Sequence, residues 1–446
     1  MNYIAKNLSI LRYGFPALSL LFHSFYQSSE VIYIFYLFLL FSIFFEKLNN
    51  NIKLLIFLLP CLGYAPLVDS GSNPITMFYL LVFLKYIILK APNKAFKVKP
   101  VICAFLLITL ELINFYIYKQ TSVLEFFRWA ALLFFAVLLI AERDSVVDFN
   151  FIYSPFIYGY LTSAIAGLFY YISLKNHVAT HEVDGMIARF SGLAGDPNNF
   201  GLYAILAIIF TLYKLSKTDS RLVYRLLIVF FIITGMLTVS RTFTIVFILI
   251  SFLYFLFIPI YKNSTIVVFS LFLLVIFSLF FNFDFNINIV DHIIERFSFS
   301  EIGNLTGGRS YIFSSYIDKF SGLNAYQQLT GVGVLNYLEY YHQLSPSDFI
   351  PKSNALVGPH NTFIEALISF GILGSMILLG LLISLFYPSG YKIHYNKESL
   401  FFIFSVLVCI ILFSMSLQNL AKYNFYFLLV LIVSFQRMVF KPQVKL

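Results

Sequence analysis

Long uninterrupted apolar runs are the feature that most limits what this chain can fold into. They continue for roughly 17–25 residues, the length that an α-helix needs to cross a bilayer, and they lack the period-2 alternation of a membrane β-barrel. Of the 446 residues, 60% are hydrophobic and 11% are charged, whereas a typical soluble domain has about 25% charged residues. The sequence therefore predicts an all-α polytopic membrane protein. It excludes soluble enzymes, nucleic-acid-binding modules and disordered scaffolds.

The polar interruptions between these runs predict about 12–14 transmembrane helices. Two early runs are short, and Pro60 interrupts the second, so the number stays open between these values. The whole chain, 1–446, is expected to form one integral membrane domain with two long loops, 175–197 and 283–360. The expected spans are 8–26, 31–45, 53–68, 74–90, 100–118, 123–141, 151–174, 198–216, 222–239, 241–260, 264–282, 361–387, 399–417 and 421–438.

Lysine and arginine placement predicts the orientation in the membrane. With the N-terminus inside, alternate loops hold 19 basic residues on the inner side and ten on the outer side. Cytoplasmic loops carry the excess of Lys and Arg, so both termini should be cytoplasmic and both long loops should lie outside. The net charge of +9 is then mainly an orientation signal and not a surface for nucleic acid.

Three of the arginines on the outer side, which holds the smaller share of the basic residues, are candidate binding residues. Arg189 precedes Asp196-Pro197, which has the pattern of an N-cap and first helical residue. Arg241 sits at a turn between two apolar spans, where a charge is costly unless it is paired or faces water. Arg309 lies in the long loop. Arginines suit bidentate binding of phosphate oxygens, so this group predicts a phosphate site.

A histidine stands where the long loop ends and the next span begins. His360 precedes this helix at the outer boundary, where a histidine can titrate near neutral pH and accept a hydroxyl proton. Thr362 and Glu365 follow with the spacing of a capping box. Glu365 is also an alternative proton acceptor. Glu111 lies within a predicted span, and we expect it to be paired or packed inside the bundle.

These stretches together resemble the O-antigen polymerase and O-antigen ligase superfamily of bacterial envelope glycosyltransferases. The matching segments are ARFSGLAGDPNNFG, SRT at the start of a span, GGRSYIF, LTGVGVLNY and PHNTFIEALISFGILG. They cover roughly residues 185–375. The resemblance implies a large periplasmic loop facing a lipid-linked saccharide donor at the inner (cytoplasmic) membrane.

The resemblance also assigns roles to individual residues. Arg189 and Arg241 would hold the donor diphosphate, and Arg309 a saccharide or phosphate. His360 would be the catalytic base. The other residues assigned to substrate binding are Asn198, Asn361 and Glu365.

The implied reaction is glycosyl transfer from undecaprenyl diphosphate, with neither metal nor nucleotide cofactor. The chain has no Asp-x-Asp pair, and Glu142 in an inner loop is expected to be a solvated charge. Besides the lipid-linked oligosaccharide and the bilayer, the resemblance adds a chain-length regulator protein as a candidate partner, and no nucleic acid. A repeat-unit polymerase is the first hypothesis; a ligase acting on lipid A-core and a flippase or transporter are the alternatives.

The predicted orientation can be tested by cysteine labelling. We expect Ser347→Cys to react with a membrane-impermeant thiol reagent on intact spheroplasts, and Lys445→Cys to react only after the membrane is opened. The background for both variants is a chain in which Cys61, Cys103 and Cys409 are replaced by alanine. The opposite labelling pattern would invert the topology.

Overall fold

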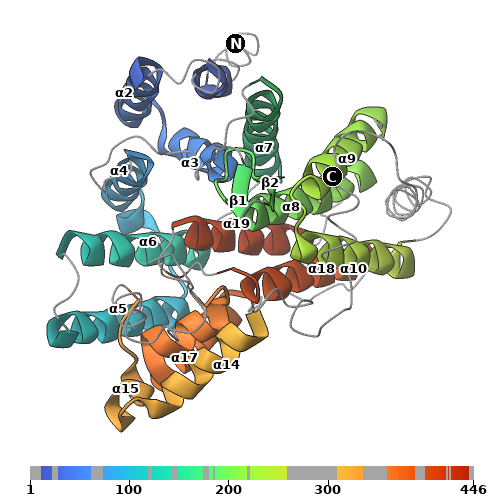
Figure 1. Ribbon diagram of the computed structural model, residues 1–446. Helices are drawn as coiled ribbons and strands as arrows, with labels where there is room; N and C mark the ends of the chain where they lie inside the picture. The colour runs from blue at the N-terminus through green and yellow to red at the C-terminus, as the bar shows by residue number, and fades with distance from the viewer. Residues whose placement is uncertain are drawn as a thin grey trace.

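A computed structural model of the protein describes most of the chain as helices, with one small β-hairpin (Figure 1). The described residues are 12–22, 29–61, 74–118, 123–142, 149–173, 180–183, 186–217, 221–258, 309–334, 359–386, 397–417, 420 and 423–440. The predicted span 264–282 and most of the predicted loop 283–360 lie outside them.

The helices follow the predicted apolar runs closely. A helix over residues 12–22 comes first. It is followed by α2 (Ser29–Phe45), α3 (Leu48–Leu58), α4 (Pro74–Leu89), α5 (Val98–Tyr118), α6 (Val123–Ala141), α7 (Phe149–Ser173), α8 (Pro197–Ser216), α9 (Arg221–Met236), α10 (Arg241–Phe257), α14 (Arg309–Gly322), α15 (Ala325–Thr330), α17 (Thr362–Phe386), α18 (Lys397–Ser414) and α19 (Tyr423–Phe440), with 3₁₀ turns η1 (Leu59–Cys61) and η2 (Ala91–Asn93).

Six helices in the described ranges are long and apolar enough to cross a membrane: α5, α6, α7, α8, α17 and α18. Shorter apolar helices of 10–17 residues include α2, α3, α4, α9 and α10. The predicted class, an all-α polytopic membrane protein, is confirmed. The predicted run 53–68 begins earlier, as α3, and gives way to η1 around Pro60, because proline lacks an amide hydrogen and crowds the preceding turn.

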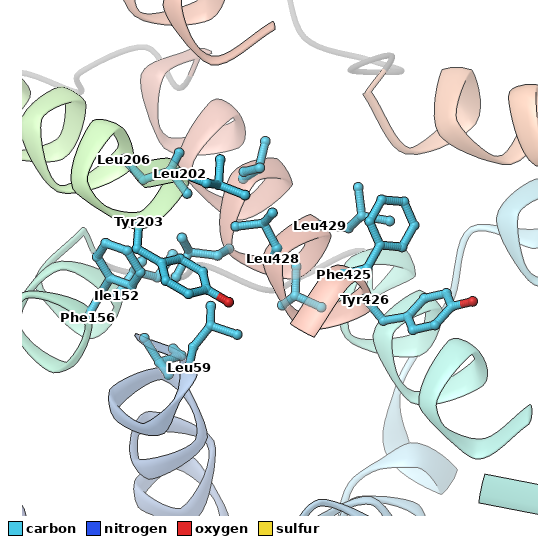
Figure 2. Packing of buried hydrophobic residues seen from close by; sticks show 14 of the residues in the cluster. Leu59, Ile152, Phe156, Leu202, Tyr203, Leu206, Phe425, Tyr426, Leu428 and Leu429 are labelled. Carbon is cyan, nitrogen blue, oxygen red and sulfur yellow. The ribbon is translucent and has the colours of Figure 1, made fainter. Parts of the chain in front are cut away.

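Helix α8 forms the centre of the bundle. Every residue from Pro197 to Leu212 is buried, as expected for a helix that is apolar on all sides. It packs against α7, α9, α10 and α18. Figure 2 shows Leu202, Tyr203 and Leu206 of α8 near side chains from α7, η1 and α19. The start of α8, where the candidate site lies, is therefore held by a packed core.

The predicted outer loop 175–197 contains a hairpin that the sequence analysis did not foresee. Strands β1 (Thr180–Val183) and β2 (Met186–Phe190) pair in antiparallel fashion, with Thr180 opposite Phe190 and His181 opposite Arg189. In Figure 1 the hairpin lies near α7 and α8. Its second strand leads directly into the start of α8.

The described part of the predicted loop 283–360 folds back onto the membrane helices. Helices α14 and α15 both pack against α17. A small apolar cluster holds them there, formed by Tyr316, Val332 and Ile368. The loop therefore contributes directly to the surroundings of the α17 start.

The expectation for Glu142 is wrong. Its side chain is 2% exposed and forms ion pairs with Lys94 (2.8 Å) and Lys90 (3.4 Å). The carboxylate stays buried because two lysines near the end of α4 reach it; a buried charge is tolerated only with such partners. Glu142 thus fastens the end of α6 to the α4–α5 connection.

Candidate functional site

The first candidate residues lie where α8 begins. The Asp196 carboxylate accepts hydrogen bonds from the backbone amides of Asn198 (2.8 Å) and Asn199 (2.9 Å), and Pro197 is the first helical residue. This confirms the predicted N-cap. Asp196 thereby satisfies two amide groups that the first helical turn leaves without partners.

Arg189 connects the hairpin to the turn between α9 and α10. Its Nε donates to the backbone oxygen of Thr238 (3.1 Å), and an Nη2 hydrogen bond reaches Asn198 Oδ1 (3.4 Å). The neighbouring backbone amide of Phe190 donates to Leu237 O at 3.2 Å. The half-buried guanidinium therefore lies between the starts of two helices, α8 and α10.

Ser240 joins the start of α8 to the start of α10. Its hydroxyl donates to Asn198 Oδ1 (2.9 Å) and accepts from the backbone amide of Phe243 (3.3 Å), so it caps α10 while binding the start of α8. Ser240 is 2% exposed. Asn198 Oδ1 thus receives hydrogen bonds from both Arg189 and Ser240. We call these three residues, together with Arg241, which follows Ser240, the arginine cluster.

Arg241 follows Ser240 as the first residue of α10, and it is half-buried. The starts of α8 and α10 both carry the partial positive charge of a helix N-terminus. The Asn198–Ser240 hydrogen bond holds these two starts together. Two arginines at paired helix N-termini form a surrounding suited to an anion such as a diphosphate.

The second group of candidate residues surrounds the start of α17. The N-cap is Asn361, whose Oδ1 accepts from the amides of Phe363 (2.9 Å) and Ile364 (3.2 Å). Thr362 lies inside the helix and its hydroxyl donates to Leu417 O at 2.7 Å. The predicted capping box of Thr362 and Glu365 is therefore wrong. The cap stands one residue earlier, because asparagine is at least as good an N-cap as threonine.

Glu365 serves a tertiary contact instead of a cap. It is 1% exposed, and its Oε2 accepts from the backbone amide of Leu420 at 3.1 Å. The oxygen of Leu420 in turn accepts from Trp129 Nε1 (3.2 Å) and the Tyr426 hydroxyl (2.6 Å). Glu365 thus fixes the connection between α18 and α19 beside the start of α17.

His360 and Val239 share an unusual backbone conformation. Their φ angles are 45° and 48°, and among the described residues they are the non-glycine positions with positive φ. Histidine adopts this region more readily than most residues, whereas a β-branched valine is an outlier there. Such strained positions cluster at functional sites. His360 immediately precedes the Asn361 cap, and Val239 lies two positions before Arg241.

Arg309 is placed through its backbone. It is the first residue of α14, and α14 packs against α17. Arg309 thus belongs to an element on the α17 side of the molecule. Its side chain lies outside the described part of the structure.

The described hydrogen bonds divide the candidate residues into two groups. The arginine cluster joins α8 to α10, whereas Asn361 and Glu365 order the start of α17 beside the 415–420 connection. Helix α18 links the two groups, since it packs against α8 and α10 and then leads into that connection. The joint action of His360 and the arginines is a prediction.

Sequence reasoning missed Ser240 and underestimated the part played by Glu111. A serine directly before an apolar run is a recognised N-cap signal, so the role of Ser240 in α10 could have been found. The hydrogen bond between Glu111 Oε2 and the Val334 amide (2.9 Å) joins residues 223 positions apart. That contact confirms the expected internal pairing of Glu111, but no local pattern identifies its partner.

A family model described as O-antigen ligase matches residues 226–379, which supports the resemblance to the O-antigen polymerase and ligase superfamily. The matched range contains Arg241, Arg309, His360, Asn361 and Glu365. No curated protein matches the chain.

Removing the Ser240 hydroxyl should weaken the arginine cluster. We expect Ser240→Ala to destabilise the protein by about 1 kcal/mol, as for a lost N-cap, and to reduce affinity for a short-chain polyprenyl diphosphate about tenfold. Thermal unfolding in detergent with added ligand measures both. The matched control is Asn324→Ala, which removes the N-cap of α15. If both variants lose affinity equally, Ser240 has no special part in anion binding.

Proposed function

We propose that this protein, whose residues 226–379 match a family model described as O-antigen ligase, is an O-antigen polymerase. It would join undecaprenyl-diphosphate-linked oligosaccharide repeat units at the periplasmic face of the inner membrane, with both termini cytoplasmic. Members of this family are glycosyltransferase-like enzymes. The proposal includes a chain-length regulator protein as partner.

The observation that carries this proposal is the hydrogen-bonded arginine cluster. The family match begins at residue 226, yet Arg189 and Asn198 lie upstream of it. Asn198 Oδ1 binds both Arg189 and Ser240, and Ser240 directly precedes Arg241 within the matched range. Arg189, which lies upstream of the matched range, therefore adds a second arginine near the start of α10, where Arg241 is the first residue.

The arginine cluster suits the leaving group of the proposed reaction. As the bond between the anomeric carbon and the diphosphate oxygen breaks, negative charge develops on undecaprenyl diphosphate. Preorganised donors stabilise such developing charge without having to reorganise during the reaction. Arg189 and Arg241, beside the positive ends of α8 and α10, are the groups that we assign to this task.

The acceptor half of the reaction needs a base. An acceptor sugar hydroxyl attacks the anomeric carbon, a new glycosidic C–O bond forms, and the electron pair of the old bond leaves with the diphosphate. The hydroxyl proton passes to His360, so that the atoms and charges of the step balance. A positioned base contributes about 10²–10⁴-fold to such a step. A single displacement of this kind inverts the anomeric centre.

A ligase is the second candidate function, because the matching family model bears that description. A ligase would use the same donor and leaving group but transfer finished polymer to lipid A-core. A transporter is less well supported. In transporters, the ends of a broken helix bind the substrate or its coupling ion. In the described part of this chain, the carbonyl groups beside the break in α17 accept hydrogen bonds from another segment of the protein itself.

Lipopolysaccharide banding distinguishes polymerase from ligase. In a strain lacking this gene, we expect a single repeat unit on the core, because a ligase would still attach unpolymerised units. Complementation with the wild-type chain should restore the ladder. A core without any repeat unit in the deletion strain would identify the protein as the ligase.

The base assignment leads to a second experiment. His360→Asn should reduce glycosidic bond formation by about 10² or more while donor binding persists, because asparagine tolerates positive φ. Glu365→Gln should stay active, since its amide oxygen can still accept from Leu420. Both variants are assayed with purified lipid-linked repeat units at equal protein levels. An inactive Glu365→Gln protein beside an active His360→Asn protein would transfer the base role to Glu365.

A further inference from the structure

Helix α17 is two helical segments joined at a break. Gly371 has φ 63° and ψ −168°, values outside any helix. The first segment, 362–370, begins directly after His360 and the Asn361 cap. Because the break interrupts the α-helical hydrogen-bond ladder, the second segment does not by itself fix the orientation of the first. Other parts of the chain must therefore hold the segment 362–370.

The segment Gly331–Val334 fills the break. The amides of Val332 and Gly333 donate to Ile368 O (3.0 Å) and Ser369 O (2.8 Å). These carbonyls stand at the end of the first segment, where a helix leaves acceptors without partners. The two backbones come so close that each needs a glycine. A Cβ at Gly331 would lie 2.2 Å from Ser369 O, and one at Gly371 would lie 2.5 Å from Gly331 N.

Helix α5 holds this filling segment at both ends. Glu111 Oε2 accepts from the Val334 amide at 2.9 Å, and Asn114 Nδ2 donates to Thr330 O at 3.0 Å. Glu111 is 1% exposed and Asn114 is fully buried. Residues three apart lie on one face of a helix, so the two side chains act as one clamp. Figure 1 shows α5, α15 and α17 together at one end of the molecule.

We infer that Glu111 and Asn114 are positioning residues for the transfer reaction. They fix Gly331–Val334, which binds the end of the segment 362–370 and so orients the turn that presents His360. This inference rests on the proposed function. It assigns a catalytic consequence to two buried side chains in a helix far from the candidate site in sequence.

The position of the segment 362–370 depends on contacts at both of its ends. The segment 362–370 is held by the Asn361 cap, by Thr362 and Glu365 on the 417–420 connection, and by the Gly331–Val334 pairing at its other end. With the far end released, the segment can tilt about its first turn. A displacement of about 1 Å at a reacting group can reduce a rate about 100-fold. Loss of the clamp should therefore lower kcat more than it weakens donor binding.

The test uses the purified full-length protein with lipid-linked repeat units. We expect Glu111→Leu to lower kcat roughly 10- to 100-fold per folded molecule, with little change in donor KM. Glu111→Gln should restore kcat, since its amide oxygen can accept from the Val334 amide. Asn114→Ala should reproduce the loss without changing any charge, and it keeps the test decisive if Glu111→Leu fails to fold.

Glu142→Leu is the matched control, because it removes another buried carboxylate, one that is paired with Lys90 and Lys94. It should lower stability and leave kcat of the folded fraction unchanged. Wild-type kcat in both Glu111→Leu and Asn114→Ala, or an inactive Glu111→Gln, would overturn the inference. A wild-type protein that forms no glycosidic bond would instead overturn the proposed function.

Discussion

Hydrogen bonds from buried side chains to interrupted backbone are the constraint on which the candidate site depends. Within an apolar bundle no bulk water is present to satisfy an amide or carbonyl at a helix end, so each needs a partner from the protein. The buried Ser240 and Asn361 and the half-buried Asp196 supply acceptors at three helix starts, and the buried Glu365 and Glu111 supply them to connecting segments. The polar residues of the candidate site are therefore also the residues that allow the backbone to turn there.

The same side chains thus serve the fold and the proposed chemistry, so a substitution at one of them affects both. Asn198 was predicted to bind substrate, yet its oxygen accepts from Arg189 and from Ser240. A side chain in this position can orient the Arg189 guanidinium and the Ser240 hydroxyl without touching the substrate. Glu365 likewise is committed to Leu420. The roles of His360, Arg241 and Arg309 in binding and catalysis remain predictions.

The sequence predicted most of the helices and part of the site. Apolar run lengths and the Asp196-Pro197 pattern each depend on neighbouring residues, so they could be recognised locally. The choice of Asn361 over Thr362 as N-cap could not, because the two candidates are adjacent and the Thr362 hydroxyl donates instead to a carbonyl distant in sequence, Leu417 O. The Glu111–Val334 contact spans 223 positions, and the hairpin lacked a strong alternating pattern. Contacts of this kind arise only from the tertiary fold.

The attachment of the hairpin to the α9–α10 turn bears on how this protein can diverge. Phe190 and Arg189 bind there to the main-chain oxygens of Leu237 and Thr238. Every amino acid offers the same carbonyl group, so the side chain at position 237 can change during evolution without loss of that bond. The hairpin and the turn can thus acquire substitutions independently while the guanidinium keeps its place.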